Sequence, residues 1–205
     1  MHLSEGVATL PVLVTGGVLG VGLTAAGLRK TDPMDLPKTA MLAAAFFAAA
    51  LVRVPIGPAC AHLTLNGFLG LLLGWPAVPA ILTALFLQAA LFQIGGLTTL
   101  GVNLFVTAGP AMAAWFLFAK IAHRKPARLA LLAAFAAGVT GILMGASLLA
   151  LALAFSGEPF FPAAKLIVIA HLPVAAIEGL VTAFALAFIR KTRPDLFNME
   201  PLHVV

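Results

Sequence analysis

Charged residues are scarce in this sequence. Of its 205 residues only 9% are charged, 62% are hydrophobic, and the mean hydropathy is +1.10. A soluble globular domain carries roughly 25% charged residues, so this composition excludes that class and indicates an integral membrane protein. The apolar runs have helical length and lack the alternation, over segments of about ten residues, that a membrane β-barrel requires. The expected fold class is therefore all-α.

Three further absences narrow the function. Cys60 is the single cysteine, so no disulfide framework is expected. No "GxxxxGK[ST]" motif is present, which excludes ATP hydrolysis of the P-loop type in this chain. No "HExxH" pair is present either, which argues against an intramembrane metalloenzyme. We expect no enzymatic activity and no nucleic-acid partner.

Breaks between the apolar runs predict one transmembrane domain over residues 1–205. The segment "RKTDPMDLPK" ends the first run, because its charges and two prolines cannot continue a helix in lipid. The interruption "RVPIGPACAH" and the short run "HLTLNGFLGLLLG" predict non-helical backbone at one membrane face, since a full span needs about 20 residues. We predict about seven transmembrane helices: 7–28, 39–54, 63–74, 76–94, 98–119, 129–155 and 165–190.

The basic residues predict the orientation. Ten of the twelve lysines and arginines fall in alternate loops or in the tail, and such loops are usually cytoplasmic. The C-terminus is therefore expected inside, and both the N-terminus and the loop "VPIGPACAHLT" outside. A cleaved signal peptide is disfavoured for the first run, because its positive charge follows the apolar stretch. The ten residues are Arg29, Lys30, Lys38, Lys120, Arg124, Lys125, Arg128, Arg190, Lys191 and Arg193.

The chain begins with "MHLSEG", which places a histidine second. A free α-amine at Met1, the His2 amide nitrogen and the His2 imidazole Nδ1 would close five- and six-membered chelate rings around one metal ion. Three nitrogens in one plane suit Ni(II) or Cu(II), and binding must displace the amide proton. A fourth donor is needed, and His62 lies in an outer loop on the same predicted face. The alternative is that His2 is a solvated surface residue.

Four blocks of sequence resemble one known family. They are "MHLSEG", "VPIGPACAHLTLNGFLGLLLG", "LFQIGGLTTLGVN" and "HLPVAAIEGLVTAFALAFIRKTRPDLF". Together they are similar to the substrate-binding membrane subunit of nickel/cobalt transporters of the energy-coupling-factor (ECF) type, the NikM/CbiM family. The resemblance covers nearly the whole chain, and the blocks occur in the family's order and spacing.

The resemblance implies a seven-helix subunit whose extra helix leads to the metal site. Carried over by motif, the metal ligands are Met1, His2 and His62, the same residues that topology brings together. No cofactor is implied beyond the transported Ni(II) or Co(II). The implied partners are a transmembrane coupling subunit, cytoplasmic ATPases and a small accessory membrane subunit, in a bacterial or archaeal cytoplasmic membrane.

A stripe of small residues is the candidate partner interface. Ala40, Ala44 and Ala48 recur every fourth residue, so they share a helix face that another helix can approach closely in lipid. We predict that this stripe docks the coupling subunit, as the family resemblance also implies. Packing inside the bundle is the alternative.

Several polar residues are candidates for support of the metal site. Glu5 could offset the metal's charge or hydrogen-bond an imidazole, and Asn66, one helical turn after His62, could orient the loop. Thr98, Thr99 and Asn103 could do the same from the opposite side. For each, a structural role is the alternative.

His171 and Glu178 lie seven residues apart, on one face of the last predicted helix. Ionisable groups at such depth usually face the bundle interior. His171 could support the metal site and Glu178 could pair with polar neighbours, or both could be structural.

A lone secondary transporter or channel that uses Glu178 is the rival function, since coupling-ion carboxylates lie near the midplane in that class. That reading leaves the "MH" start unexplained. Between the metals, a planar set of four nitrogens favours Ni(II) over Co(II).

Overall fold

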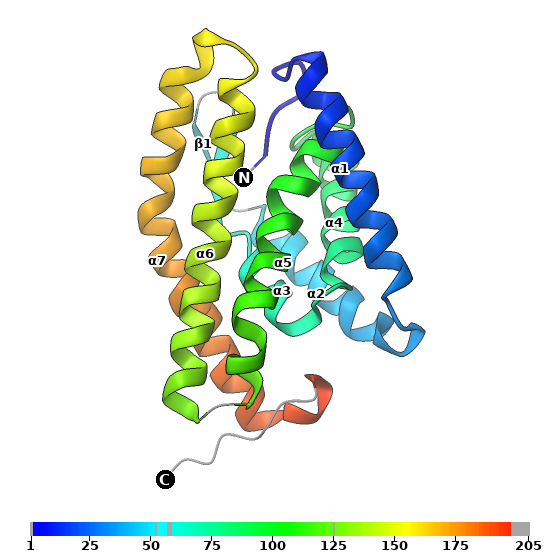
Figure 1. Cartoon of the computed structure of the whole chain (residues 1–205), viewed down its shortest axis with the longest axis vertical. Coiled ribbons are helices and arrows are strands. Elements are labelled where there is room, and N and C mark those ends of the chain that lie inside the picture. The colour runs from blue at the N-terminus through cyan, green and yellow to red at the C-terminus, as the bar shows by residue number, and fades with distance from the viewer. Residues whose placement is uncertain (1, 52, 57–58, 125, 198–205) are drawn as a thin grey trace.

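The computed structural model describes residues 2–51, 53–56, 59–124 and 126–197. Within these residues the chain forms seven α-helices and a two-stranded antiparallel hairpin (Figure 1). The helices are α1 (Leu10–Arg29), α2 (Leu36–Ala49), α3 (Asn66–Leu73), α4 (Ala77–Phe92), α5 (Leu100–Arg124), α6 (Ala127–Ala154) and α7 (Phe161–Thr192). The strands are β1 (Arg53–Ile56) and β2 (Ala59–His62), and short 3-10 turns are η1 (Pro33–Asp35), η2 (Glu158–Phe160) and η3 (Pro194–Phe197).

The helix order follows the sequence prediction, but several boundaries differ by up to five residues. The helix predicted over 39–54 ends at Ala49, because the chain continues into β1 from Arg53. Pro55 in β1 is compatible with the outer strand of a hairpin and not with a helix interior. The expected non-helical backbone between the second and third helices is confirmed in that the hairpin fills this segment.

Helix length separates two groups. Among the described residues, four helices are long and apolar enough to cross a membrane: Leu10–Arg29, Leu100–Arg124, Ala127–Ala154 and Glu158–Thr192. By contrast α3 has 8 residues, which extend only about 12 Å against a hydrocarbon core of about 30 Å. Seven full-length spans therefore remain a prediction, whereas the membrane class is supported by the four long helices.

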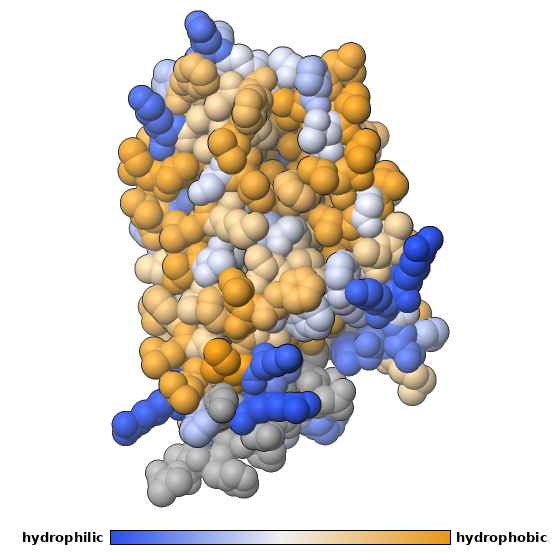
Figure 2. Space-filling view, in the orientation of Figure 1, coloured by the Kyte–Doolittle hydropathy of each residue, from blue (hydrophilic) through white to orange (hydrophobic). Residues whose placement is uncertain are grey.

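The long helices set the axis of the molecule (Figure 1). α5 lies at the centre and packs against α1, α3, α4 and α6, while α7 packs against α6 and the hairpin. The ends of α1, α5 and α7 and the start of α2 lie at the lower end of the view. Hydrophilic side chains gather at that end of the visible face, and hydrophobic ones cover most of the rest (Figure 2).

Aromatic and basic side chains meet at the same lower end. Lys30 Nζ lies 4.1 Å from the centroid of the Trp75 ring, and the Trp75 and Trp115 rings meet edge to face at 6.5 Å. Tryptophans with flanking lysines are typical of a membrane–water boundary. These contacts are compatible with a membrane interface at this end of the bundle.

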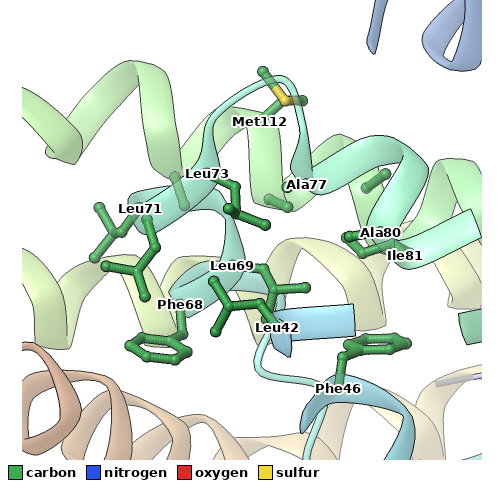
Figure 3. Packing of buried hydrophobic residues seen from close by; sticks show 14 of the residues in the cluster. Leu42, Phe46, Phe68, Leu69, Leu71, Leu73, Ala77, Ala80, Ile81 and Met112 are labelled. Atoms are coloured by element: carbon green, nitrogen blue, oxygen red, sulfur yellow. The ribbon is translucent and has the colours of Figure 1, made fainter. Parts of the chain in front are cut away.

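The short helix α3 is buried along its whole length. A Cβ placed on Gly67 would overlap the carbonyl of Ala137 in α6, and one on Gly70 would overlap the carbonyl of Ala111 in α5. These two glycines therefore allow backbone-to-backbone packing, which is the main source of helix association where lipid surrounds the protein. Figure 3 shows side chains of α2, α3 and α4 filling the space beside this helix.

Candidate metal centre

His2 and Leu3, at the start of the described chain, are buried in the interior of the bundle. Leu3 is fully buried and belongs to the same apolar cluster as Val102 and Val106 of α5. Its backbone is held at both polar groups by Asn103: Leu3 N–H donates to Oδ1 at 2.7 Å, and Asn103 Nδ2 donates to the Leu3 carbonyl at 3.1 Å. Thr99 Oγ1 donates to the same carbonyl at 3.0 Å. The neighbouring His2 is therefore anchored on α5, with only 3% of its surface exposed.

His62 is the last residue of β2 and is 4% exposed. Its Nδ1 lies 2.8 Å from the carbonyl oxygen of Leu63. A carbonyl can only accept, so Nδ1 carries the proton, and in the neutral ring Nε2 then presents a lone pair. This is the tautomer in which Nε2 can bind a metal.

The two histidines meet although sixty positions separate them in sequence. His2 Nδ1 and His62 Nε2 are 2.9 Å apart, and the rings are stacked with centroids 4.7 Å apart and an interplanar angle of 19°. The structure thus brings together two of the three residues predicted as ligands. The third, Met1, lies outside the described residues.

The spacing of the two nitrogens matches adjacent positions in a square metal complex. Metal–imidazole bonds are about 2.0–2.1 Å long, so two donors at a right angle lie about 2.9 Å apart, whereas two opposite donors lie about 4.1 Å apart. The observed 2.9 Å is the right-angle value. It is also an ordinary N–H···N hydrogen-bond distance, so a metal ion bound to both nitrogens would take the place of the shared proton.

Side chains alone do not complete such a site. Within the part of the chain that the structure describes, no three His, Cys, Asp or Glu side chains gather as a metal cage. Among the described side chains of these four types, a metal ion at this position would therefore have two donors, His2 and His62. This is compatible with a chelate in which backbone nitrogen supplies the others.

Glu5 and Asn66, two predicted support residues, contact other groups. The Glu5 carboxylate accepts a hydrogen bond from Thr98 Oγ1, and Glu5 N–H donates to the Gly95 carbonyl at 3.1 Å. Asn66 begins α3 and does not follow His62 on one helix, so the predicted one-turn relation is wrong; its Nδ2 donates to the Gly141 carbonyl at 3.2 Å. Asn66 therefore ties α3 to α6.

His171 is fully buried in α7. Its Nδ1 lies 2.7 Å from the carbonyl of Ile167, one turn earlier on the same helix. Its Nε2 has no hydrogen-bond partner among the described residues. Both interpretations of His171 from the sequence, support of the metal site and a structural role, stay predictions.

Thr99 and Asn103 contact a different segment from the one expected. They hold the backbone of Leu3, and so the terminal segment, instead of the loop around His62. The sequence reasoning did not select Leu3. The signal was available, since Leu3 is a large apolar residue within the otherwise polar stretch "HLSEG".

The alanine stripe lies on the outer face of α2. Ala40, Ala44 and Ala48 are all exposed, whereas the buried residues of this helix are Thr39, Leu42 and Phe46. Packing of the stripe inside the bundle, the alternative considered from sequence, is therefore wrong. Docking of a partner remains a prediction.

A bundle of apolar helices that buries two stacked imidazoles in contact with each other is compatible with a membrane protein that handles transition-metal ions. The comparisons agree. Residues 2–196 match the family model CbiM, described as the cobalt uptake substrate-specific transmembrane region. The chain belongs to this family, a metal-transport component whose members include proteins named for cobalt and for nickel transport.

Individual relatives cover almost the whole chain. A Haemophilus influenzae protein named for metal transport is 39% identical, covering 97% of each chain. The cobalt transport protein CbiM of Sorangium cellulosum is 36% identical over 97% of this chain and 95% of its own. A crystal structure of a transition metal transporter superimposes with a TM-score of 0.78 at 27% identity, covering 93% of each chain.

Two further relatives are fusions. A Rhodobacter capsulatus protein is named as the fused nickel transport protein NikMN and is 31% identical. A Methanocorpusculum labreanum protein is named as a fused cobalt transport protein CbiMQ and is 31% identical. This chain covers 63% and 36% of them, respectively.

Proposed function

We propose that this chain is the substrate-specific subunit of an ATP-driven importer of the ECF type and binds Ni(II), with Co(II) as the second candidate, at high affinity. The carrying observation is the pair formed by His2 Nδ1 and His62 Nε2, buried and 2.9 Å apart. The wider statement, cobalt or nickel uptake by a membrane protein of this family, rests on family membership.

The proposed site has four nitrogen donors. The Met1 α-amine, the His2 amide nitrogen and His2 Nδ1 form the chelate, and His62 Nε2 fills the fourth corner. In that arrangement His62 lies opposite the amide nitrogen and at a right angle to His2 Nδ1. The 2.9 Å separation supports this placement, because it is the spacing of neighbouring corners.

The donor set favours nickel. Ni(II) and Cu(II) accept a tetragonal arrangement of nitrogens, while affinity along the first row rises from Co(II) through Ni(II) to Cu(II). Selection against copper would then depend on metal supply and on the transport machinery. Relatives named for cobalt and for nickel leave both metals as candidates.

Energy coupling is proposed to come from partner subunits. The sequence has no P-loop, so ATPases and a transmembrane coupling subunit would supply the driving force, with a small accessory membrane subunit beside them. The fused relatives are compatible with membrane partners of this kind. The exposed Ala40, Ala44 and Ala48 stripe would allow close approach by the coupling subunit.

We further propose a multi-pass placement in the cytoplasmic membrane, with the basic end of the bundle inside. The tryptophan–lysine contact at that end supports an interface there, and the excess of Lys and Arg in the sequence near that end favours the cytoplasmic side. A metal ion would then reach His2 and His62 from the outer side of the membrane.

The rival function, a secondary transporter that uses Glu178, receives no support from the geometry. The carboxyl group of Glu178 accepts hydrogen bonds from the backbone N–H groups of Thr64 and Leu65. A carboxyl engaged in this way is a structural acceptor, whereas a coupling-ion site needs a group that exchanges its ion.

The test is metal titration of purified protein with its native terminus, beside a version with one residue added before Met1. The native form should bind one Ni(II) with a yellow, diamagnetic, square-planar spectrum, and the extended form should not, because its amine is displaced from the chelate. Equal binding by both forms, or binding by neither, would refute the proposed site.

A further inference from the structure

The loop that follows His62 is held by one side chain from α7. Glu178 is 1% exposed, and its carboxyl group faces the loop. Thr64 N–H donates to Oε1 at 2.8 Å and Thr64 Oγ1 donates to the same oxygen at 3.2 Å. Leu65 N–H donates to Oε1 in a short contact and lies 3.2 Å from Oε2. One carboxyl group thus binds two successive backbone amides and a hydroxyl.

This loop needs an external acceptor. Only residues 63–65 separate the end of β2 from the start of α3. Leu65, the residue at the N-cap position of α3, has a positive φ of 49° and no side-chain capping bond. A non-glycine residue in this conformation persists only when its surroundings fix it. The Glu178 carboxyl supplies that constraint.

The hydrogen bonds continue from Glu178 to the His62 ring. The carboxyl group holds the amides of Thr64 and Leu65. The Thr64 N–H and the Leu63 carbonyl belong to one planar peptide group, so the Leu63 carbonyl is held as well. The Leu63 carbonyl in turn accepts from His62 Nδ1 at 2.8 Å, which sets the tautomer and the rotation of the ring. Nε2, on the other side of the ring, is thereby directed at His2.

We infer that Glu178 is the positioning residue for His62: it holds the loop whose carbonyl orients the metal-binding imidazole. This inference rests on the proposed function for its consequence in metal binding. In this role Glu178 acts as a hydrogen-bond acceptor whose side-chain length matters. Its charge is not required, and it carries no ion.

Three substitutions separate reach from charge. Glu178→Gln keeps the length of the side chain and an acceptor oxygen at the Oε1 position. Glu178→Asp keeps the charge and shortens the side chain by one methylene. Glu178→Met keeps the approximate volume and removes the acceptor. Thr182→Val is the matched control, since Thr182 is fully buried one turn further along the same helix and its hydroxyl has no hydrogen-bond partner among the described residues.

The first experiment is Ni(II) titration of these proteins, with native termini, followed by absorbance and calorimetry. Glu178→Gln and Thr182→Val should bind close to the parent. Glu178→Asp and Glu178→Met should bind roughly 10–100-fold more weakly, as is typical when the group that orients a ligand is lost. Their ligand-field absorption bands should also shift, because His62 approaches the metal at a different angle.

Two results would overturn the inference. Equal Ni(II) affinity and equal spectra for all four variants would show that Glu178 does not position His62. If Glu178→Asp kept the parental Ni(II) affinity and Glu178→Gln lost it, the charge of the side chain would matter and its length would not.

A second measurement needs no metal and separates this inference from the proposed function. In Glu178→Met, amide exchange at Thr64 and Leu65 should accelerate, and the ¹⁵N shifts of the His62 ring should report loss of the Nδ1–H bond to Leu63. Both should stay unchanged in Glu178→Gln. If the parent fails to bind Ni(II), the proposed function fails, and these two readouts still decide whether Glu178 positions His62: unchanged exchange and an unchanged tautomer in Glu178→Met refute it.

Discussion

Replacing Asn103 with leucine should weaken metal binding without touching a metal ligand. Asn103 is 2% exposed and bonds both the N–H and the carbonyl of Leu3. Leucine has a similar size and no polar atoms, so Asn103→Leu removes both bonds while it fills the space. The terminal segment that carries His2 would then lose part of its anchor on α5.

The magnitude follows from those two bonds. A buried backbone group that loses its partner costs about 1–3 kcal/mol, and each 1.4 kcal/mol is a factor of about ten in affinity. Burial of the Leu3 side chain still contributes about 1.5–3 kcal/mol to docking, and Thr99 still donates to the Leu3 carbonyl. Molecules whose terminal segment is not docked on α5 cannot bind the metal, so the apparent affinity falls in proportion to the docked fraction. We therefore expect Ni(II) affinity to fall by roughly 5–30-fold.

The assay is calorimetric titration with Ni(II) in detergent or nanodiscs, using protein with its native terminus. Thr99→Val is the graded control, because it removes one of the two donors to the Leu3 carbonyl and leaves the Leu3 N–H paired. It should weaken binding by less than about fivefold. The absorption spectrum of the fully loaded Asn103→Leu protein should match the parent, since the ligands are unchanged.

Two outcomes would refute this reasoning. Parental affinity in Asn103→Leu would mean that the Leu3 anchor contributes nothing to holding His2. A changed spectrum at saturation would mean that Asn103 acts on the metal itself, which the hydrogen bonds to Leu3 do not explain.

The remaining predictions concern the partner surface, the second buried histidine and the order of metals. Ala44→Trp should abolish co-purification with the coupling subunit while Ni(II) binding by the isolated chain persists; Val21→Trp, at a 71% exposed position of α1, is the control, and undiminished association of Ala44→Trp would remove the docking role. His171→Ala should lower the Tm and leave Ni(II) affinity within about threefold of the parent, because its Nδ1 bonds to its own helix, and a tenfold loss would instead assign it support of the metal site. Competition titrations should give the affinity order Cu(II), Ni(II), Co(II), and preference for Co(II) over Ni(II) would contradict a planar nitrogen site.

Hydropathy predicted the fold well wherever lipid determines the sequence. The long helices α5, α6 and α7 match apolar runs, because each residue facing lipid must be apolar and each backbone group must be paired within the helix. The predictions were weakest around residues 50–65. That segment forms a hairpin that contacts α7 and leads into the buried short helix α3, so the hydropathy of a full membrane span does not describe it.

Part of the candidate site could be predicted from the sequence. His2 and His62 could be named because charge placed them on one face and because the chemistry of a Met-His start is local. The hydrogen bonds that hold the segments around them, at Leu3, Leu63 and Thr64, could not be predicted, since backbone hydrogen bonds leave no residue-type signal in a single sequence. Glu178 was recognisable as a buried ionisable residue, but its partners are backbone amides 113 and 114 positions away.

The two imidazoles are anchored on different helices, His2 on α5 through Asn103 and His62 on α7 through Glu178. Both helices pack on α6, where a Cβ on Gly138 would meet the Glu178 carbonyl oxygen at 2.6 Å. The separation of the two nitrogens is therefore fixed by the packing of three helices, and metal–ligand distances tolerate only about 0.2 Å of error. Coupling between two equilibria is reciprocal. The free energy by which this helix packing strengthens metal binding therefore equals the free energy by which a bound metal would stabilise the packing. It follows that any partner able to separate α5 from α7 would lower the affinity of the site for its metal.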